Sequence, residues 1–181
     1  MQTFETARLL MRPLQPEDES FYCTCYTDPV LMQHIGEPLS PEAALRSFMA
    51  ALKITPEAPV RRYTWVMQEK KSDACVGLLA LIADKNKPVS GNAELGNIMF
   101  TEFQNQGFTV EALSRLVDIV FSTTPLSDVF ANHRIQNSAV NRVMKKLGFL
   151  HDMSVSQEIS KGRWNLSRND WQALRLKPNS I

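Results

Sequence analysis

The stretch "ELGNIMFTEFQNQGFTVEAL", residues 94–113, is the most informative part of the chain, because it joins an expected strand to an expected helix through a loop with one glycine. Backbone N–H groups at the start of a helix form a natural binding site for phosphate groups. A single glycine is enough for such a loop if only one position needs unusual backbone angles or a close approach. Gly107 therefore marks either a phosphate-binding loop or an ordinary helix start.

The bulk composition indicates one globular domain, residues 1–181, with no broad charge imbalance. Lys and Arg number 20 and Asp and Glu 19, for a net charge of +1, so no nucleic-acid partner is expected. No apolar run approaches the roughly 18 residues of a membrane span, and the start "MQTFETARLLMRPL" lacks a signal-peptide layout. We expect a cytoplasmic protein without a membrane partner.

The cysteine and histidine content argues against a disulfide framework and against a metal site. Three cysteines, Cys23, Cys25 and Cys75, make an odd count, and three histidines are scattered along the chain. The Cys23–Cys25 pair is not followed by a second pair at metal-ligand spacing. Free or structural thiols and no metal are the expectation.

Hydrophobic periodicity and turn residues divide the chain into short strands and helices. We expect seven strands, at residues 7–14, 63–70, 74–83, 93–100, 127–133, 153–159 and 163–167. Helices are expected at residues 16–28, 40–53, 107–121 and 137–149, the last closed by Gly148. Lys161 and Gly162 are expected to form the turn of a closing hairpin, and Asn169 or Asp170 to cap a last short turn. This order predicts an α/β sandwich, a mixed sheet with helices on both faces.

Four segments, in order, resemble the GNAT acetyltransferase superfamily and within it the RimJ/RimL type, which acetylates protein N-terminal amines. They are "ETARLLMRPLQPEDESF" at 5–21, "DPVLMQHIGEPLSPEAAL" at 28–45, the stretch at 94–113, and "VFANHRIQNSAVNRVMKKLGF" at 129–149. The resemblance implies a mostly antiparallel seven-stranded sheet with a splay after the fourth strand. It also implies acetyl-CoA as co-substrate, an amine acceptor, and a monomer or homodimer.

The resemblance favours a phosphate-binding loop at Gly107 over a plain helix start. The family pattern Q/R-x-x-G-x-G/A corresponds to Gln104-Asn105-Gln106-Gly107-Phe108-Thr109, and these six residues are the implied coenzyme A contacts. Gln104 and Gly107 match the pattern. Thr109 departs from it, but lies in the first helical turn, where backbone angles are ordinary.

Other coenzyme A contacts follow from the same resemblance. Asn137 is expected to bind the pantetheine arm through its side-chain amide, or to cap the helix that follows, or both. Backbone groups of Met99, Phe100 and Thr101 are expected to meet the thioester and pantetheine. The N–H of Met99 is then placed to stabilise an oxyanion. Arg142 and Lys145 are candidates for the 3′-phosphate, although a solvated helix face explains them equally well.

Glu94 is the candidate general base, acting directly or through a water molecule; the alternative is an ordinary charged strand residue. The acceptor is expected beside His34, Tyr22 and Asn132. Three further candidates near the same groove are Phe21, Tyr26 and His133. The aromatic residues fit a helix core as well, and both histidines fit ordinary loop positions, although their pKa lies near neutrality.

This chain lacks the hydroxyl that the family pattern provides to protonate the leaving thiolate. Relatives carry a tyrosine where this chain has Met144, or a serine where it has Val140. Three hypotheses follow: an acetyl-CoA-dependent N-acetyltransferase, a non-catalytic acyl-CoA-binding protein, and a transferase with a different acyl donor.

Overall fold

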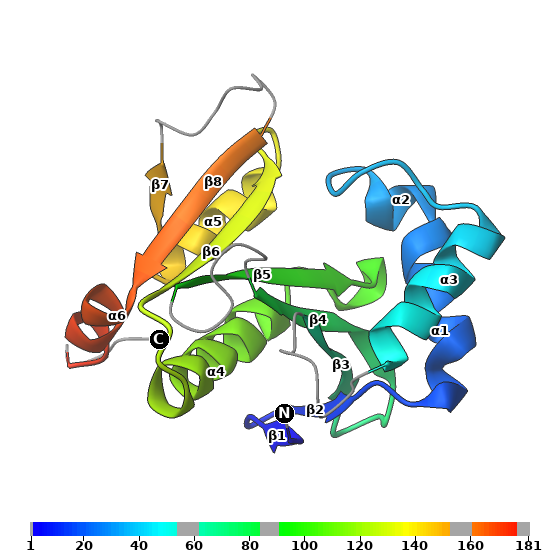
Figure 1. Cartoon of the computed structure of the whole chain (residues 1–181), viewed down its shortest axis with the longest axis horizontal. Coiled ribbons are helices and arrows are strands. Elements are labelled where there is room, and N and C mark those ends of the chain that lie inside the picture. Colours follow the sequence, from blue (N-terminus) through cyan, green and yellow to red (C-terminus); the bar gives the residue numbers. More distant parts are fainter. Residues whose placement is uncertain (1, 54–61, 84–90, 153–160, 177–181) are drawn as a thin grey trace.

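The computed structural model describes residues 2–53, 62–83, 91–152 and 161–176. Its strands form one sheet in the order β1-β2-β3-β4-β5-β6-β8-β7 (Figure 1). The strands are β1 (Phe4–Glu5), β2 (Leu9–Pro13), β3 (Arg62–Glu69), β4 (Cys75–Ala83), β5 (Asn92–Met99), β6 (Asp128–Arg134), β7 (Leu150–Asp152) and β8 (Lys161–Ser167). Among these strands every neighbouring pair is antiparallel except β5–β6, so the mixed, mostly antiparallel sheet is confirmed. Two of these strands, β1 and β7, do not coincide with a predicted strand, because two or three residues are too few to show a period.

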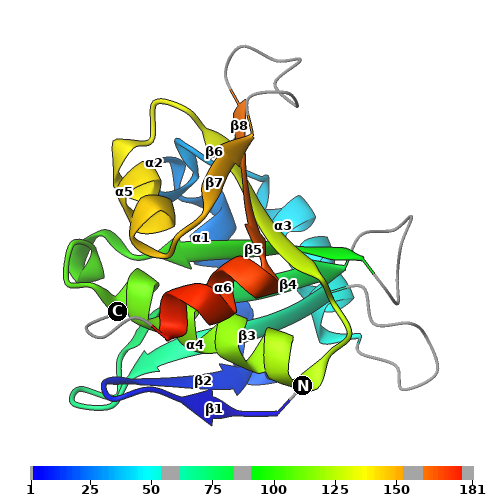
Figure 2. The same ribbon diagram turned by 90° about the vertical axis from the view of Figure 1, so that its left-hand side faces the viewer.

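Helices cover both faces of the sheet, as the sequence predicts (Figures 1 and 2). The helices are α1 (Glu19–Thr27), α2 (Pro29–Met32), α3 (Pro41–Leu52), α4 (Phe108–Thr123), α5 (Ser138–Lys146) and α6 (Arg168–Arg175), with 3-10 turns η1 (Pro16–Asp18) and η2 (Thr101–Phe103). Helices α1 to α3 pack on one face, and α4 and α5 on the other. Ser40 caps α3 as predicted, since its side chain accepts a bond from the N–H of Ala43.

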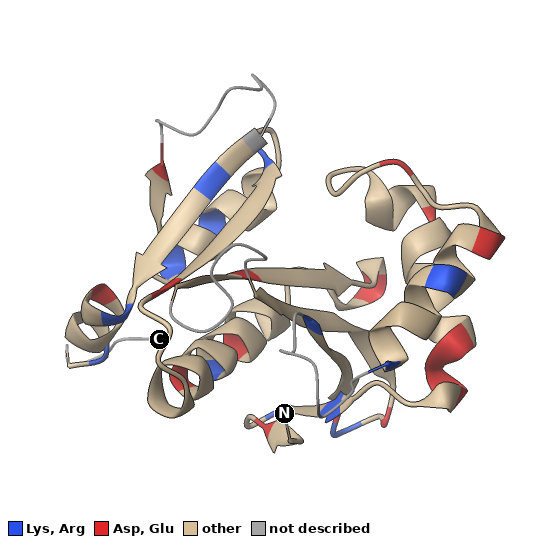
Figure 3. Cartoon of the chain, in the orientation of Figure 1, with Lys and Arg blue, Asp and Glu red and all other residues tan. Residues whose placement is uncertain are grey.

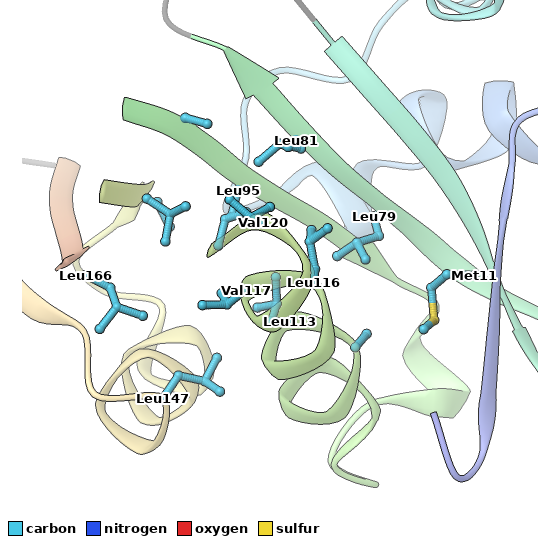
Figure 4. Packing of buried hydrophobic residues seen from close by; sticks show 14 of the residues in the cluster. Met11, Leu79, Leu81, Leu95, Leu113, Leu116, Val117, Val120, Leu147 and Leu166 are labelled. Carbon is cyan, nitrogen blue, oxygen red and sulfur yellow. The ribbon is translucent and has the colours of Figure 1, made fainter. Parts of the chain in front are cut away.

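Two apolar clusters hold these layers together. The larger one joins the stripe of α4 to β4 and β5, and Figure 4 shows Leu113, Leu116 and Val120 directed at the sheet. The smaller one joins α1 and α3 to the opposite face, where Tyr22 and Phe48 are almost fully buried. Neighbouring residues of β4 alternate between the two clusters, which explains its continuous apolar sequence.

Strands β5 and β6 part soon after they meet. Their parallel pairing covers only Asn92–Glu94 and Asp128–Phe130, while β5 continues to Met99. Beyond Glu94, β6 pairs only with β8 and rises away from β5 (Figure 1). This is the splay expected after the fourth predicted strand.

The C-terminal part departs from the sequence prediction in two places. Lys161 and Gly162 lie within β8 and pair with β6, so they do not form a turn. The partner strand β7 begins at Leu150, and the predicted strand at 153–159 lies outside the described residues. Ser167, not Asn169 or Asp170, caps α6, because its Oγ accepts the N–H of Asp170 at 3.1 Å.

Gly77→Ala is expected to destabilise the fold. A methyl group there would lie 2.1 Å from the carbonyl oxygen of Ile98 and 2.9 Å from Cε of Met67, so β4 and β5 would have to separate. Overpacking of this kind costs about 1–3 kcal/mol, or roughly 2–4 °C in Tm for each kcal/mol. Gly96→Ala is the matched control on β5, where the added methyl meets only Cβ of Ala80 at 3.8 Å. Equal thermal denaturation curves for the two variants would contradict this assignment.

Candidate functional site

A cavity of about 1120 Å³ opens where β5 and β6 part. Its wall includes His133 and Met144 on the α4–α5 side of the sheet and Tyr26 and Arg62 on the α1–α3 side. The cavity therefore passes from one face of the sheet to the other through the splay. Two ligands that enter from opposite faces can meet there.

The predicted phosphate-binding loop forms one end of this cavity. Gly107 is the N-cap of α4 with φ of 84°, a left-handed conformation that suits glycine, and Asn105 is also left-handed. Gly107 has no side chain, so the first N–H groups of α4 have no side-chain cap. Five of the six predicted loop residues line the cavity: Gln104, Asn105, Gly107, Phe108 and Thr109. The uncapped helix start thus faces the space where an anion can bind.

Met99 is oriented as the sequence predicts for an oxyanion contact. The N–H of the next residue, Phe100, donates to the carbonyl of Val76 on β4 at 3.0 Å. Hydrogen-bonding direction alternates along an antiparallel strand, so the N–H and C=O of Met99 and Asn97 point away from β4 and into the splay. The Gln104 side chain donates from Nε2 to the Met99 carbonyl at 2.9 Å, and this bond connects the loop to the end of the strand. Asn97 also lines the cavity. The sequence does not predict this residue as part of the site, because its position depends on a strand register that the sequence does not show.

Three predicted coenzyme A contacts are not on the cavity wall. Phe100 stacks on Phe21 with ring centroids 5.3 Å apart, and its N–H is used by β4. Thr101 is exposed at the start of η2. Gln106 is also exposed, and its side chain donates to the carbonyl of Glu102 at 2.9 Å. Their side chains lie away from the cavity because the chain turns outward after Met99, and the backbone contacts expected of them stay a prediction.

A network on the outer side of the loop was not predicted. Arg8 donates from Nη1 to the carbonyl of Gln106 at 2.9 Å and from Nε to Glu111 at 2.7 Å. Glu111 also accepts bonds from Thr6 and from the N–H of Arg8. The Arg8–Glu111 pair therefore clamps the loop and the first turn of α4 to the N-terminal segment. Its partners lie 103 residues apart, so no local sequence signal announces it.

The start of α5 forms another part of the wall. Asn137 caps this helix, since its Oδ1 accepts the N–H of Val140 at 3.1 Å, so the predicted cap is confirmed. Its amide nitrogen is left to donate to a ligand. Arg142 lies on the cavity wall with Lys146, whereas the predicted Lys145 does not. Val140 and Met144 also line the cavity and offer no hydroxyl.

His133 bridges β6 and α5. The Asn141 amide donates to the carbonyl of Ile135 at 2.9 Å, so its oxygen faces His133 and accepts from Nε2 at 2.8 Å. The Nδ1 atom is then an acceptor, buried and without a partner in the described structure. Burial lowers the pKa of His133, partly opposed by the Asn141 bond. The ring stacks on Trp164 at the α5 side of the cavity.

Glu94 and its neighbours form the wall on the α1–α3 side. Glu94 lines the cavity and accepts a bond from Nδ2 of Asn132 at 3.0 Å, and His34 lies on the same wall. Tyr22 does not reach it, because it is fully buried and its hydroxyl bonds to Ser47 at 2.9 Å. The prediction for Tyr22 is wrong by one helical turn, since Tyr26 lies on the wall instead. Burial raises the pKa of Tyr26, which keeps that hydroxyl protonated.

Comparison with known families identifies the fold. The family model described as "Acetyltransferase (GNAT) domain" matches residues 8–150, more than half of the chain. The chain belongs to the GNAT acetyltransferase family. It is accordingly an N-acetyltransferase, an enzyme that moves an acetyl group to an amine, and the family uses acetyl-CoA as donor.

Relatives of this GNAT protein agree in length and architecture. An uncharacterized N-acetyltransferase, p20 of Bacillus licheniformis, is 24% identical over 168 residues, which cover 90% of this chain and 91% of p20. The Vibrio cholerae spermidine N-acetyltransferase, solved with CoA and spermine, superposes with a TM-score of 0.75 at 17% identity, over 91% and 98% of the chains. RimL, a ribosomal L7/L12 alpha-N-protein acetyltransferase solved with CoA, gives 0.75 at 14% identity, over 92% and 98%. At these identities the structures establish the fold alone.

The described residues contain no group of three His, Cys, Asp or Glu side chains that is arranged to hold a metal ion. In the same ranges, none of the helices has the length and apolar character needed to cross a membrane.

Glu111→Gln is expected to lower the free energy of unfolding at neutral pH but not in acid. Burial opposes the charge on Glu111, but bonds from Thr6 and Arg8 outweigh it and hold its pKa below the ordinary value of 4.5. The carboxylate thus contributes stability that is present above that ordinary value and is lost as pH falls through the lowered pKa. Urea unfolding from about pH 7 down to about pH 3 measures the difference. Glu37→Gln, at an exposed residue outside the network, should follow the wild type; a pH-independent gap for Glu111→Gln would sink the assignment.

Proposed function

We propose that this GNAT protein uses acetyl-CoA to acetylate a primary amine by direct attack, as an enzyme of the RimJ/RimL type. The amine belongs to a protein N-terminus or a small molecule. The observation that carries the proposal is the cavity itself, with the uncapped start of α4 at one end and Glu94 toward the other. Acetyl-CoA supplies the acetyl group as an activated thioester.

The residues on the α4–α5 side fit the donor. The N–H groups after Gly107 bind the pyrophosphate, because a helix start attracts negative charge. Asn137 donates its amide N–H to the pantetheine arm while its oxygen caps α5. Arg142 and Lys146 lie on the same wall and take the 3′-phosphate.

The end of β5 stabilises the negative charge that develops on the acetyl oxygen. The N–H of Met99 points into the splay, and Asn97 presents a second N–H one pleat earlier. Backbone donors that are fixed before the reaction need little rearrangement as charge appears, which makes them effective. Gln104 holds the Met99 carbonyl and thereby keeps this strand end in place.

Glu94 accepts the proton that the amine loses. Its Cα lies five residues before Met99, or roughly 16 Å along an extended strand. That separation favours transfer through water molecules over direct contact. Asn132 orients the carboxylate through the bond to Oε1 and leaves its other oxygen for this task.

The thiolate leaves without a hydroxyl donor on α5. Met144 is 2% exposed and belongs to the main core, so the helix face that relatives use for a tyrosine is here part of the packing. A thiol pKa of about 8.5 makes the thiolate a tolerable leaving group. We infer that water provides the final proton, at some cost in rate.

The same apolar face motivates one alternative for the transferred group. A transferase with a longer acyl group would use Val140, Val143 and Met144 as an acyl pocket. Comparing turnover across acyl-chain lengths tests this alternative, since a strict acetyl preference excludes it.

Gly107→Ala is expected to weaken acetyl-CoA binding about tenfold. The left-handed φ of 84° is unfavourable for alanine by roughly 1–2 kcal/mol, and relief of that strain turns the loop N–H groups away. Acetyl-CoA at about a hundred times its Kd should raise the wild-type stability by about 2.7 kcal/mol. Thermal shift measurements over a range of ligand concentrations give the Kd of each protein. Gly36→Ala is the control, since its added methyl meets only Cε of Met32 at 4.0 Å. Unchanged binding in Gly107→Ala would argue against the loop.

Glu94→Gln is expected to lower kcat by about 10²–10⁴ with acetyl-CoA affinity unchanged. Release of free CoA thiol in the presence of an amine panel measures turnover. Glu102→Gln, at an exposed residue away from the cavity wall, should retain wild-type rates. Full activity of Glu94→Gln would remove Glu94 as the base. A wild type that binds acetyl-CoA but releases no thiol with any amine would count against the proposed direct transfer to a primary amine.

A further inference from the structure

The wall on the α1–α3 side is more basic than an amine acceptor alone requires. The cavity wall has one acidic residue, Glu94, and the basic residues Arg62, Arg134, Arg142, Lys146 and Arg163. Figure 3 shows basic residues on β8, on α5 and at the end of β6. Arg142 and Lys146 belong to α5, where the phosphates of the donor explain them. Arg62 on β3 and Arg163 on β8 lie on the opposite face of the sheet and need another explanation.

Strand register places these two arginines on either side of Glu94. Arg62 pairs with Ile82, which pairs with Glu94, which in turn pairs with Phe130. Residues in register share a face, and neighbouring strands lie about 5 Å apart. The Cα atoms of Arg62 and Glu94, two strands apart, are therefore separated by roughly 10 Å. On the other side the Arg163 guanidinium stacks 3.6 Å above the ring centroid of Phe130. The base is therefore flanked by two guanidinium groups on one surface.

Neither guanidinium is neutralised by an ion pair within the described residues. Nε of Arg62 is buried and has no hydrogen-bond partner. Nε of Arg163 donates to the neutral amide of Asn165 at 3.0 Å. Asp152 lies across from Arg163 on β7 and accepts a bond from Asn165 at 3.1 Å. Arg62 thus brings an unpartnered guanidinium N–H to the cavity wall, and a planar anion suits a guanidinium group.

We propose that the acceptor is an amine that also carries a carboxylate, which binds Arg62 while the amine lies toward Glu94 and the splay. Arg163 adds a second positive charge to the same surface. A polyamine is disfavoured, because its other ammonium groups would lie beside two guanidinium groups without ion-pair partners. The hydroxyl of Tyr26, on the same wall, stays protonated and can donate to the carboxylate as well. This inference rests on the proposed function and specifies its substrate class.

The test compares kcat/KM for matched amines, measured by release of CoA thiol. One pair is L-alanine and L-alaninamide, which represents a free amino acid. The second is the peptide amides Ala-Glu-Ala and Ala-Gln-Ala, which represents a protein N-terminus, and spermidine is the polycation. We expect kcat/KM for the carboxylate-bearing member of at least one pair to exceed that of its neutral counterpart by about tenfold or more. Spermidine is expected to be the poorest acceptor. The pair that shows the preference identifies the source of the carboxylate.

Arg62→Gln is expected to reduce the acid-to-neutral ratio to about one, mainly through KM for the acid. Arg163→Gln, expected to reduce the ratio in part, serves if the first variant does not fold. Arg46→Gln on the exposed face of α3 is the control and should keep the wild-type ratio. A wild type that prefers spermidine or the neutral twins overturns the carboxylate proposal and leaves acetyl transfer intact. Absence of thiol release with every amine, neutral ones included, counts against the proposed function itself.

Discussion

The parting of β5 from β6 after three paired residues is the constraint on which the site depends. A strand whose outer N–H and C=O groups lose their neighbour must satisfy them in another way. In this protein the Gln104 side chain donates a hydrogen bond to the carbonyl of Met99, and the N–H groups of Asn97 and Met99 remain directed into the cavity. The interruption of the sheet thus creates both the opening and the donors that line it.

The predicted phosphate-binding loop, residues 104–109, is held by contacts on two sides. Gln104 ties it inward to the end of β5, and Arg8 ties it outward through Glu111 and the carbonyl of Gln106. Between these bonds Gly107 needs no side chain, so the start of α4 stays open. Rigid backbone donors rather than a dense basic patch carry the proposed donor site, which agrees with a net charge of only +1.

Helix α5 lines the cavity but offers no hydroxyl at Val140 or Met144 to protonate a leaving thiolate. Met144 packs into the main core and lines the cavity at once, so the position cannot carry a hydroxyl without a change in the packing. The proposed acceptor residues lie on the opposite face, where Glu94 lies between Arg62 and Phe130 in one row across the sheet. The splay therefore separates the proposed donor side, built on helix ends, from the proposed acceptor side, built on strand registers.

Local features were predictable from the sequence because they depend on near neighbours. Helix starts at Ser40 and Gly107, the cap at Asn137 and the central strands each follow from periodicity and backbone preference. Tertiary structure alone decided that Tyr26 and not Tyr22 meets the cavity, because Tyr22 is buried against Phe48 and Ser47 of α3. It also decided the Arg8–Glu111 pair and the alignment of Arg62 with Glu94, since both arise from strand and helix packing between residues far apart in the chain. No short sequence pattern encodes such registers.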